Sequence, residues 1–214
     1  MKKFEYTPPE QPRELILKLG QKITDRIGHT VTAEDPEYYG LEALVTDEMA
    51  EVALKMKVRK PMTLAQAVKA TGKEEKVLEE LLQEMSNIGL LEYNWENPKH
   101  EKQYVLPMYV PGSAEFFNMK LDQIKEHPEV ASFFERMAFL PLQKVTPMVP
   151  PGGAGIGMHV IPVEKAIETE NESVSVEHIS HWLDKYDGKY AAGPCSCRYS
   201  RGVLGEGCAD DPED

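Results

Sequence analysis

Three cysteines near the end of the chain are the residues whose type and spacing could do chemistry. Cys195, Cys197 and Cys208 lie in the segment GPCSCRYSRGVLGEGC, with the spacing Cys-x-Cys-x10-Cys. Thiolates are soft ligands that suit zinc and iron–sulfur clusters, and both kinds of centre usually take four ligands. We therefore expect a metal site at these cysteines, although the chain reaches Asp214 without a fourth cysteine.

The residues around the cysteines suit a thiolate-bound centre. Glycines in this segment let the backbone fold closely around a cluster, and Arg198 and Arg201 could offset its negative charge. Three other interpretations stay open: free thiols in an unstructured tail, a local disulfide between Cys195 and Cys197, and zinc in place of an iron–sulfur cluster. The histidines that could complete a zinc site are His159, His178 and His181.

Composition narrows the class of protein. The chain has 214 residues, 41% of them hydrophobic, which is enough for a folded core in one or two domains. Its 24 Lys and Arg against 36 Asp and Glu give a net charge of −12, so nonspecific nucleic-acid binding is disfavoured. Three cysteines exclude a secreted scaffold with several disulfides. The polar start lacks a signal-peptide core and no apolar run could span a membrane, so we expect a cytoplasmic protein.

The elements that must position the cysteines begin with helices. Apolar periodicity predicts helices over 11–27 and 41–57. The first could pack on its own domain or on a copy of itself, which leaves a homodimer open. Further along, two strands over 90–95 and 102–109 are predicted around a polar turn.

Two short motifs predict where the next helices begin. Thr63 with Gln66 reads as a capping box for a short helix that stops near Gly72, and Thr71 with Glu74 reads as a second box. The second box would open a helix over 74–88 followed by Gly89. Its predicted core face consists of Val77, Leu78, Leu81, Leu82, Met85 and Ile88.

The helix over 74–88 is acidic, which bears on DNA binding. It carries five glutamates and one lysine, a net charge of −4. A helix of that charge would be repelled from a groove walled by phosphates. The only cluster of opposite sign precedes Pro61, and it is equally well explained as a solvated helix end. That cluster consists of Lys55, Lys57, Arg59 and Lys60.

The second half of the chain is predicted as a small α/β region. Residues 111–138 read as two short helices broken at His127–Pro128, and 158–163 read as a strand. A helix is expected from Ser175 to Tyr186. The loop over 147–157 lacks a nucleotide-binding fingerprint and reads as a connector.

The order of these elements resembles a winged-helix domain over about 38–110, and the phrase MTLAQAVKATGKEEKVLEELLQEMSNIGLLEY carries that resemblance. We expect an α+β chain with four parts. They are an N-terminal arm and helix (1–37), a winged-helix-like domain (38–110), a small α/β region (111–194) and a cysteine-rich tail (195–214).

The tail GPCSCRYSRGVLGEGC resembles the Cys-x-Cys-Arg segment of multidomain anaerobic oxidoreductases, which carry four-iron clusters and, further on, FAD- and NAD(P)-binding domains. The resemblance implies that Cys195, Cys197 and Cys208 are ligands of a [4Fe–4S] cluster, and that a further cysteine follows soon after the last one. It implies no catalytic residue in this chain.

Two functions follow from these patterns. The first is the non-catalytic N-terminal module of an iron–sulfur flavoprotein oxidoreductase, which holds part of the cluster and docks downstream ferredoxin or flavin domains, or an electron-transfer partner protein. With three cysteines alone, we expect the site to be empty of its cluster. The alternative is a winged-helix transcriptional regulator with a metal- or redox-sensing tail, which the −4 helix opposes.

Overall fold

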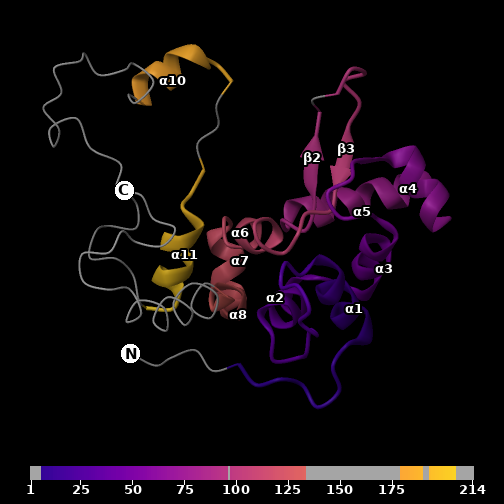
Figure 1. Cartoon of the computed structure of the whole chain (residues 1–214), viewed down its shortest axis with the longest axis vertical. Helices are drawn as coiled ribbons and strands as arrows, with labels where there is room; N and C mark the ends of the chain where they lie inside the picture. Colours follow the sequence, from indigo (N-terminus) through magenta and orange to yellow (C-terminus); the bar gives the residue numbers. More distant parts are fainter. Residues whose placement is uncertain (1–5, 96, 134–178, 190–192, 206–214) are drawn as a thin grey trace, which may run out of the picture. The chain divides into compact units, whose positions relative to one another are not determined.

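The computed structural model describes residues 6–95, 97–133, 179–189 and 193–205 (Figure 1). The chain divides into two units, one formed by Met1–Leu140 with Pro194–Asp214 and the other by Pro141–Gly193. The first unit combines helices with a three-stranded antiparallel sheet, which confirms the predicted α+β class. In the described ranges, no helix is long and apolar enough to cross a membrane.

Three helices open the first unit: α1 (Glu14–Ile23), α2 (Pro36–Leu44) and α3 (Asp47–Lys55). The single helix predicted over 41–57 is therefore wrong. Val45 adopts an extended conformation, and Thr46 caps α3 by accepting a hydrogen bond from the Met49 amide at 3.2 Å. A new helix starts there because the threonine side chain satisfies an amide that would otherwise lack a partner.

The apolar face of α1 is covered by the chain itself. Ile16, Leu19 and Ile23 are fully buried, and α1 packs against α2 and α3. Of the two alternatives for this helix, packing on its own domain accounts for its apolar face. The predicted helix over 11–27 ends early, at Ile23, and Ile27 is fully exposed beyond it.

The sheet and the next two helices follow in the order β1 (Met62–Thr63), α4 (Leu64–Thr71), α5 (Glu75–Asn87), β2 (Glu92–Asn94) and β3 (Gln103–Val105). The strand order is β1-β3-β2, so β3 lies in the middle. Tyr104 of β3 stands opposite Met62 on one side and Tyr93 on the other. The two strands predicted over 90–95 and 102–109 are confirmed as a hairpin, and β1 completes the sheet.

The first predicted capping box is confirmed. The Gln66 amide donates to the Thr63 hydroxyl at 3.3 Å, and the Thr63 amide donates to Gln66 Oε1 at 3.0 Å. Gly72 ends the helix in the left-handed region, with φ at +72°. This reciprocal pair of bonds satisfies two amides at the helix start.

The second predicted capping box is wrong. Thr71 is the last residue of α4, where its hydroxyl donates to the Ala67 carbonyl at 2.8 Å. Glu74 caps α5 instead, with its carboxylate accepting from the amides of Lys76 and Val77. Val77, in the first turn of α5, is half-exposed rather than in the core. The rest of the predicted face is covered, with Leu78, Leu81, Leu82 and Met85 buried and Ile88 partly buried.

Three short helices then complete the body of this unit: α6 (Ser113–Phe117), α7 (Leu121–Glu126) and α8 (Pro128–Ala131). The predicted break at His127–Pro128 is confirmed, and the segment before it forms two helices rather than one. Phe117, Ile124 and Val130 are buried. Asn118, also buried, donates to the carbonyls of Ala114 and Val130 and joins α6 to α8.

The segment that carries the first two cysteines forms a helix, α11 (Ser196–Val203), where a glycine-rich tail is expected from the sequence. It packs against α6, α7 and α8 of the same unit. In the other unit, α10 (Ile179–Lys185) is the described part of the helix predicted over 175–186. The loop predicted over 147–157 and the strand predicted over 158–163 lie outside the described residues.

Candidate functional site

The first turn of α11 brings two of the three predicted ligands together. Cys195 occupies the residue just before the helix and Cys197 the second position within it. Both are exposed and neither is in a disulfide. Their thiols lie close enough for a hydrogen bond between them. Cys208 lies outside the described residues.

The helix that carries the thiols is fixed to the body of the unit. Tyr199, Val203 and Leu204 pack on the hydrophobic core. Ser200 is fully buried, and its hydroxyl donates back to the carbonyls of Ser196 at 2.8 Å and Cys197 at 3.1 Å. The packing of Tyr199, Val203 and Leu204 holds one face of α11 against the protein, while the cysteines remain at its exposed start.

The start of α11 has the polarity that a negative centre needs. The side chain of Cys195 makes no capping hydrogen bond to the first turn. The amides at the start of a helix point away from it and create a partial positive charge. Anionic groups, including metal-bound thiolates and their sulfides, are stabilised in that position.

The thiol of Cys197 is held in its neutral form. Partial burial raises its pKa, the neighbouring Cys195 raises it further, and a hydrogen bond with Ser196 opposes the shift. The negative charge of Glu115 in α6 also raises it. Metal binding would therefore displace protons here, since only thiolates ligate.

The remaining residues predicted around the site are placed in part. Arg198 and Arg201 are half-buried on α11, within two turns of the thiols. His181 lies on α10 in the other unit, and His159 and His178 lie outside the described residues. In the described part of the chain, no three metal-binding side chains gather at one point. The two thiols fit half of a four-ligand centre.

The acidic face predicted on the helix over 74–88 is present on α5. The glutamates at positions 74, 75, 79, 80 and 84 are all exposed. The same is true of Lys76, the single cation of this helix. The surface that a DNA-binding helix would present is therefore dominated by carboxylates.

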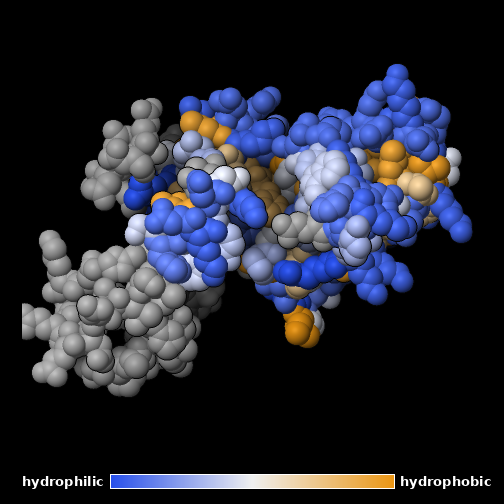
Figure 2. All heavy atoms as spheres, turned by 90° about the horizontal axis from the view of Figure 1, so that it is seen from above, coloured by the Kyte–Doolittle hydropathy of each residue, from blue (hydrophilic) through white to orange (hydrophobic). Residues whose placement is uncertain are grey.

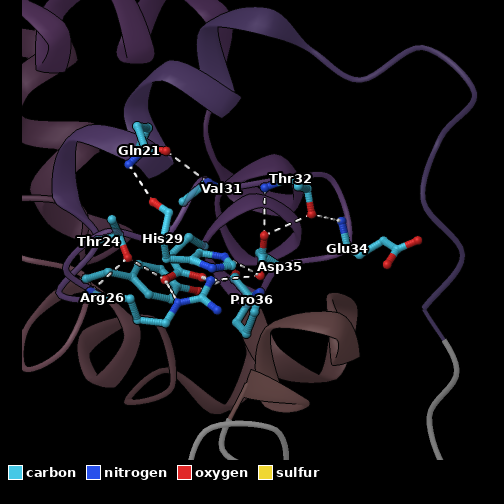
Figure 3. Close-up of polar contacts among 11 residues, drawn as sticks. Gln21, Thr24, Arg26, His29, Val31, Thr32, Glu34, Asp35 and Pro36 are labelled. Atoms are coloured by element: carbon cyan, nitrogen blue, oxygen red, sulfur yellow. Dashed lines mark hydrogen bonds and ion pairs between the residues drawn. The ribbon is translucent and has the colours of Figure 1, made fainter.

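A buried charge cluster joins the end of α1 to the start of α2 (Figure 3). Glu37 is completely buried and accepts from Arg26 Nε at 2.8 Å, from Arg26 Nη2 and from Thr24 Oγ1 at 2.7 Å. Arg26 Nη2 also donates to Asp35 at 2.8 Å, and His29 Nε2 lies 3.0 Å from the same oxygen. We call Thr24, Arg26, His29, Asp35 and Glu37 the Arg26 cluster.

The Arg26 cluster holds the Asp35 carboxylate in the charged form. Burial disfavours the charge on Asp35, but hydrogen bonds from Arg26, Thr32 and His29 outweigh it and lower its pKa to about 2. Burial alone would lower the pKa of Arg26, but its hydrogen bonds to Glu37 and Asp35 and their negative charges raise it. Its groups hydrogen-bond to one another, so its role is to fix the α1–α2 connection.

Sequence reasoning did not identify the Arg26 cluster. Arg26, Asp35 and Glu37 follow no apolar period, and charged residues between two helices ordinarily stay in solvent. The one local signal is the Thr32–Asp35 turn, in which the Asp35 carboxylate accepts from the Thr32 amide at 2.6 Å.

Comparison with known proteins adds no information about this site. No family model, curated protein or solved structure matches this chain.

Proposed function

We propose that this chain is the N-terminal, non-catalytic module of an iron–sulfur flavoprotein oxidoreductase. In this proposal α3, β1, α4, α5 and the β2–β3 hairpin form a winged-helix domain. The support is their order along the chain and the strand order β1-β3-β2, in which the first strand pairs with the last. The α11 segment then holds part of a [4Fe–4S] cluster.

One observation carries the proposal: the Cys195-x-Cys197 pair sits at the uncapped start of a helix that is packed on the same unit. Two free thiols in a mobile tail need no such support. Ligands for an electron-transferring centre do need it, because redox centres work best when their ligands move little between charge states.

When bound, such a cluster supplies one-electron transfer. The residues of this chain would hold it and place it. Cys195 and Cys197 would provide two thiolates, and Cys208 a third. The amides at the start of α11 would donate toward the sulfurs, while Tyr199 and Val203 keep the helix on α7 and α8. The fourth ligand, the flavin and the nicotinamide site would come from domains that follow in the longer protein.

The alternative function, a transcriptional regulator, receives less support from the described surface. Four exposed glutamates on α5, together with Glu74 just before it, would face the phosphates of a bound duplex. The negatively charged phosphates would repel this negatively charged helix at contact distance, and the repulsion would grow as the salt concentration is lowered. The proposed winged helix therefore serves contacts with protein rather than with DNA.

Two measurements test the proposal. The first is the coding sequence beyond codon 214, where a cysteine within a few residues and then flavin-binding motifs are expected. The second is anaerobic reconstitution of the chain with equal amounts of ferrous and ferric iron, sulfide, and mercaptoethanol as the fourth thiol, read by visible absorbance and by iron and sulfide content. Cys195→Ser and Cys197→Ser should each lose the absorbance, and Ser196→Ala on the same turn should keep it. A stop codon at that point, together with a chain that takes up no iron, would overturn the proposal. Uptake of zinc alone, lost in the same two variants, would replace the iron–sulfur assignment with a zinc site.

A further inference from the structure

Four cations lie at the end of α3 and in the turn after it. They are Lys55, Lys57, Arg59 and Lys60, four of six consecutive residues, and all are exposed. We call residues 55–60 the basic turn. Subtracting these four charges from the net charge of −12 leaves −16 on the rest of the chain. The basic turn is therefore a local patch whose sign is opposite to that of the protein.

The basic turn is held rigidly. Val58 forms a bridge with Leu106, just beyond β3, and the Arg59 amide donates to the Leu106 carbonyl at 2.8 Å. The Lys60 amide donates to the Lys57 carbonyl at 3.2 Å and closes the turn. Met56, beneath it, is buried. The backbone that carries the cations is thus ordered before any partner arrives, which reduces the entropy lost on binding.

Arg59 occupies a backbone conformation that its own type does not favour. Its φ is +57°, in the left-handed region where glycine and asparagine are less strained. Among the described residues, its side chain makes a single long hydrogen bond, from Nη2 to the Pro111 carbonyl at 3.4 Å. Nothing in the local packing requires a guanidinium at this position. The positive charge of Arg59 is therefore available to bind a partner.

The charges of the basic turn are not neutralised locally. Among the described residues, none of these four cations pairs with a carboxylate. Other cations of the same unit do: Arg13 pairs with Asp47, Lys73 with Glu48, and Arg26 with its cluster. The four cations therefore face solvent as a preformed positive surface.

We propose that the basic turn is a docking surface for an acidic segment of a partner protein. A short acidic segment could pair its carboxylates with the four cations of the basic turn without contacting the acidic remainder of the surface. A nucleic-acid duplex carries a charge about every 1.7 Å along its axis and would extend over the acidic remainder of the chain. The exposed glutamates of α5, in the same unit, oppose such an extended polyanion. The proposal does not depend on the cysteines, so its test is independent of the test of the proposed function.

The test is binding of a fluorescent polyglutamate peptide to the full chain, measured by anisotropy at low and at physiological salt. The double variant Lys57→Glu/Lys60→Glu should weaken binding about tenfold, as expected when two favourable ion pairs become repulsive. Lys69→Glu/Lys125→Glu is the matched control, because it makes the same change in net charge at two other exposed lysines. It should change binding less than about twofold.

A third variant separates charge from folding. Arg59→Asn removes the charge but suits the left-handed backbone, so it should weaken peptide binding about threefold while thermal stability is kept or raised. Equal losses in the two double variants would overturn the proposal, and so would a wild-type chain that does not bind the peptide. A short DNA duplex that binds more tightly than the peptide, and is released by Lys57→Glu/Lys60→Glu, would also overturn it in favour of nucleic acid.

Discussion

Replacing Arg26 by methionine would leave the Glu37 carboxylate buried with a single strong partner. The side chain of Glu37 has no exposed surface, and that of Arg26 is only 28% exposed. The change removes both guanidinium bonds to Glu37 and the bond to Asp35. What remains for Glu37 is the hydroxyl of Thr24 at 2.7 Å.

The expected loss follows from the burial of the pair. Removing one partner of a buried ion pair destabilises a protein by about 3–5 kcal/mol, because the other charge stays buried without compensation. The partial exposure of Arg26 places the expected value near the lower end, about 3 kcal/mol at pH 7.

The assay is urea unfolding followed by far-ultraviolet circular dichroism at pH 7. Lys18→Met, which breaks an exposed pair with Glu14, is the control and should change nothing measurable. If Arg26→Met does not fold, Arg26→Lys supplies a milder version of the same test. The double variant Arg26→Met/Glu37→Met should recover most of the loss, because two apolar groups need no compensation. A loss below about 1 kcal/mol at pH 7 in Arg26→Met would refute the reasoning, because it would make the pair equivalent to a surface salt bridge.

Three further expectations concern single residues. Gly89→Ala should lower the free energy of unfolding by more than about 2 kcal/mol, because its φ is +96° and the new Cβ would lie 2.8 Å from the Phe116 backbone. Gly72→Ala, at φ +72° with open space around it, should lower it by only about 1 kcal/mol in the same urea titration. Thr63→Ala should lose about 1 kcal/mol of unfolding free energy, since it removes the capping bond at the start of α4. The pKa of Asp35 is lowered to about 2, so the stability it provides is present above about pH 4 and lost as the pH falls toward 2; an Asp35→Asn variant should lack this acid-dependent loss in a pH series of unfolding midpoints.

The sequence predicted best where local motifs decide the structure. The Thr63–Gln66 box, the left-handed end at Gly72 and the break at His127–Pro128 depend on side chains a few residues apart, and all three are present. The prediction of one helix in place of α2 and α3 was wrong because it relied on apolar periodicity alone. The apolar stripe runs through Val45 without interruption, and only the extended conformation of that residue, with the cap at Thr46, divides it.

Features that depend on distant contacts could not be predicted in this way. Helix α11 contains Gly202, which disfavours helix, and it forms where Tyr199 and Val203 pack on helices far earlier in the chain. The spacing of Cys195 and Cys197 indicated a shared site, but not a helix start packed on the body of the unit. The burial of Glu37 arises from tertiary packing around the α1–α2 connection, and no apolar periodicity in the sequence predicts it.

The chain leaves the first unit at Leu140 and returns to it at Pro194, which makes residues 141–193 an insertion between α8 and α11. Closing a flexible loop of that length costs about 3.5 kcal/mol of chain entropy, and doubling the length would add only about 0.6 kcal/mol. A folded insertion with adjacent ends costs less. The helix that carries the thiols is therefore insensitive to the length of the segment that precedes it. Evolution or design can lengthen, shorten or exchange that insertion while Tyr199, Ser200 and Val203 keep the cysteine pair in the same place.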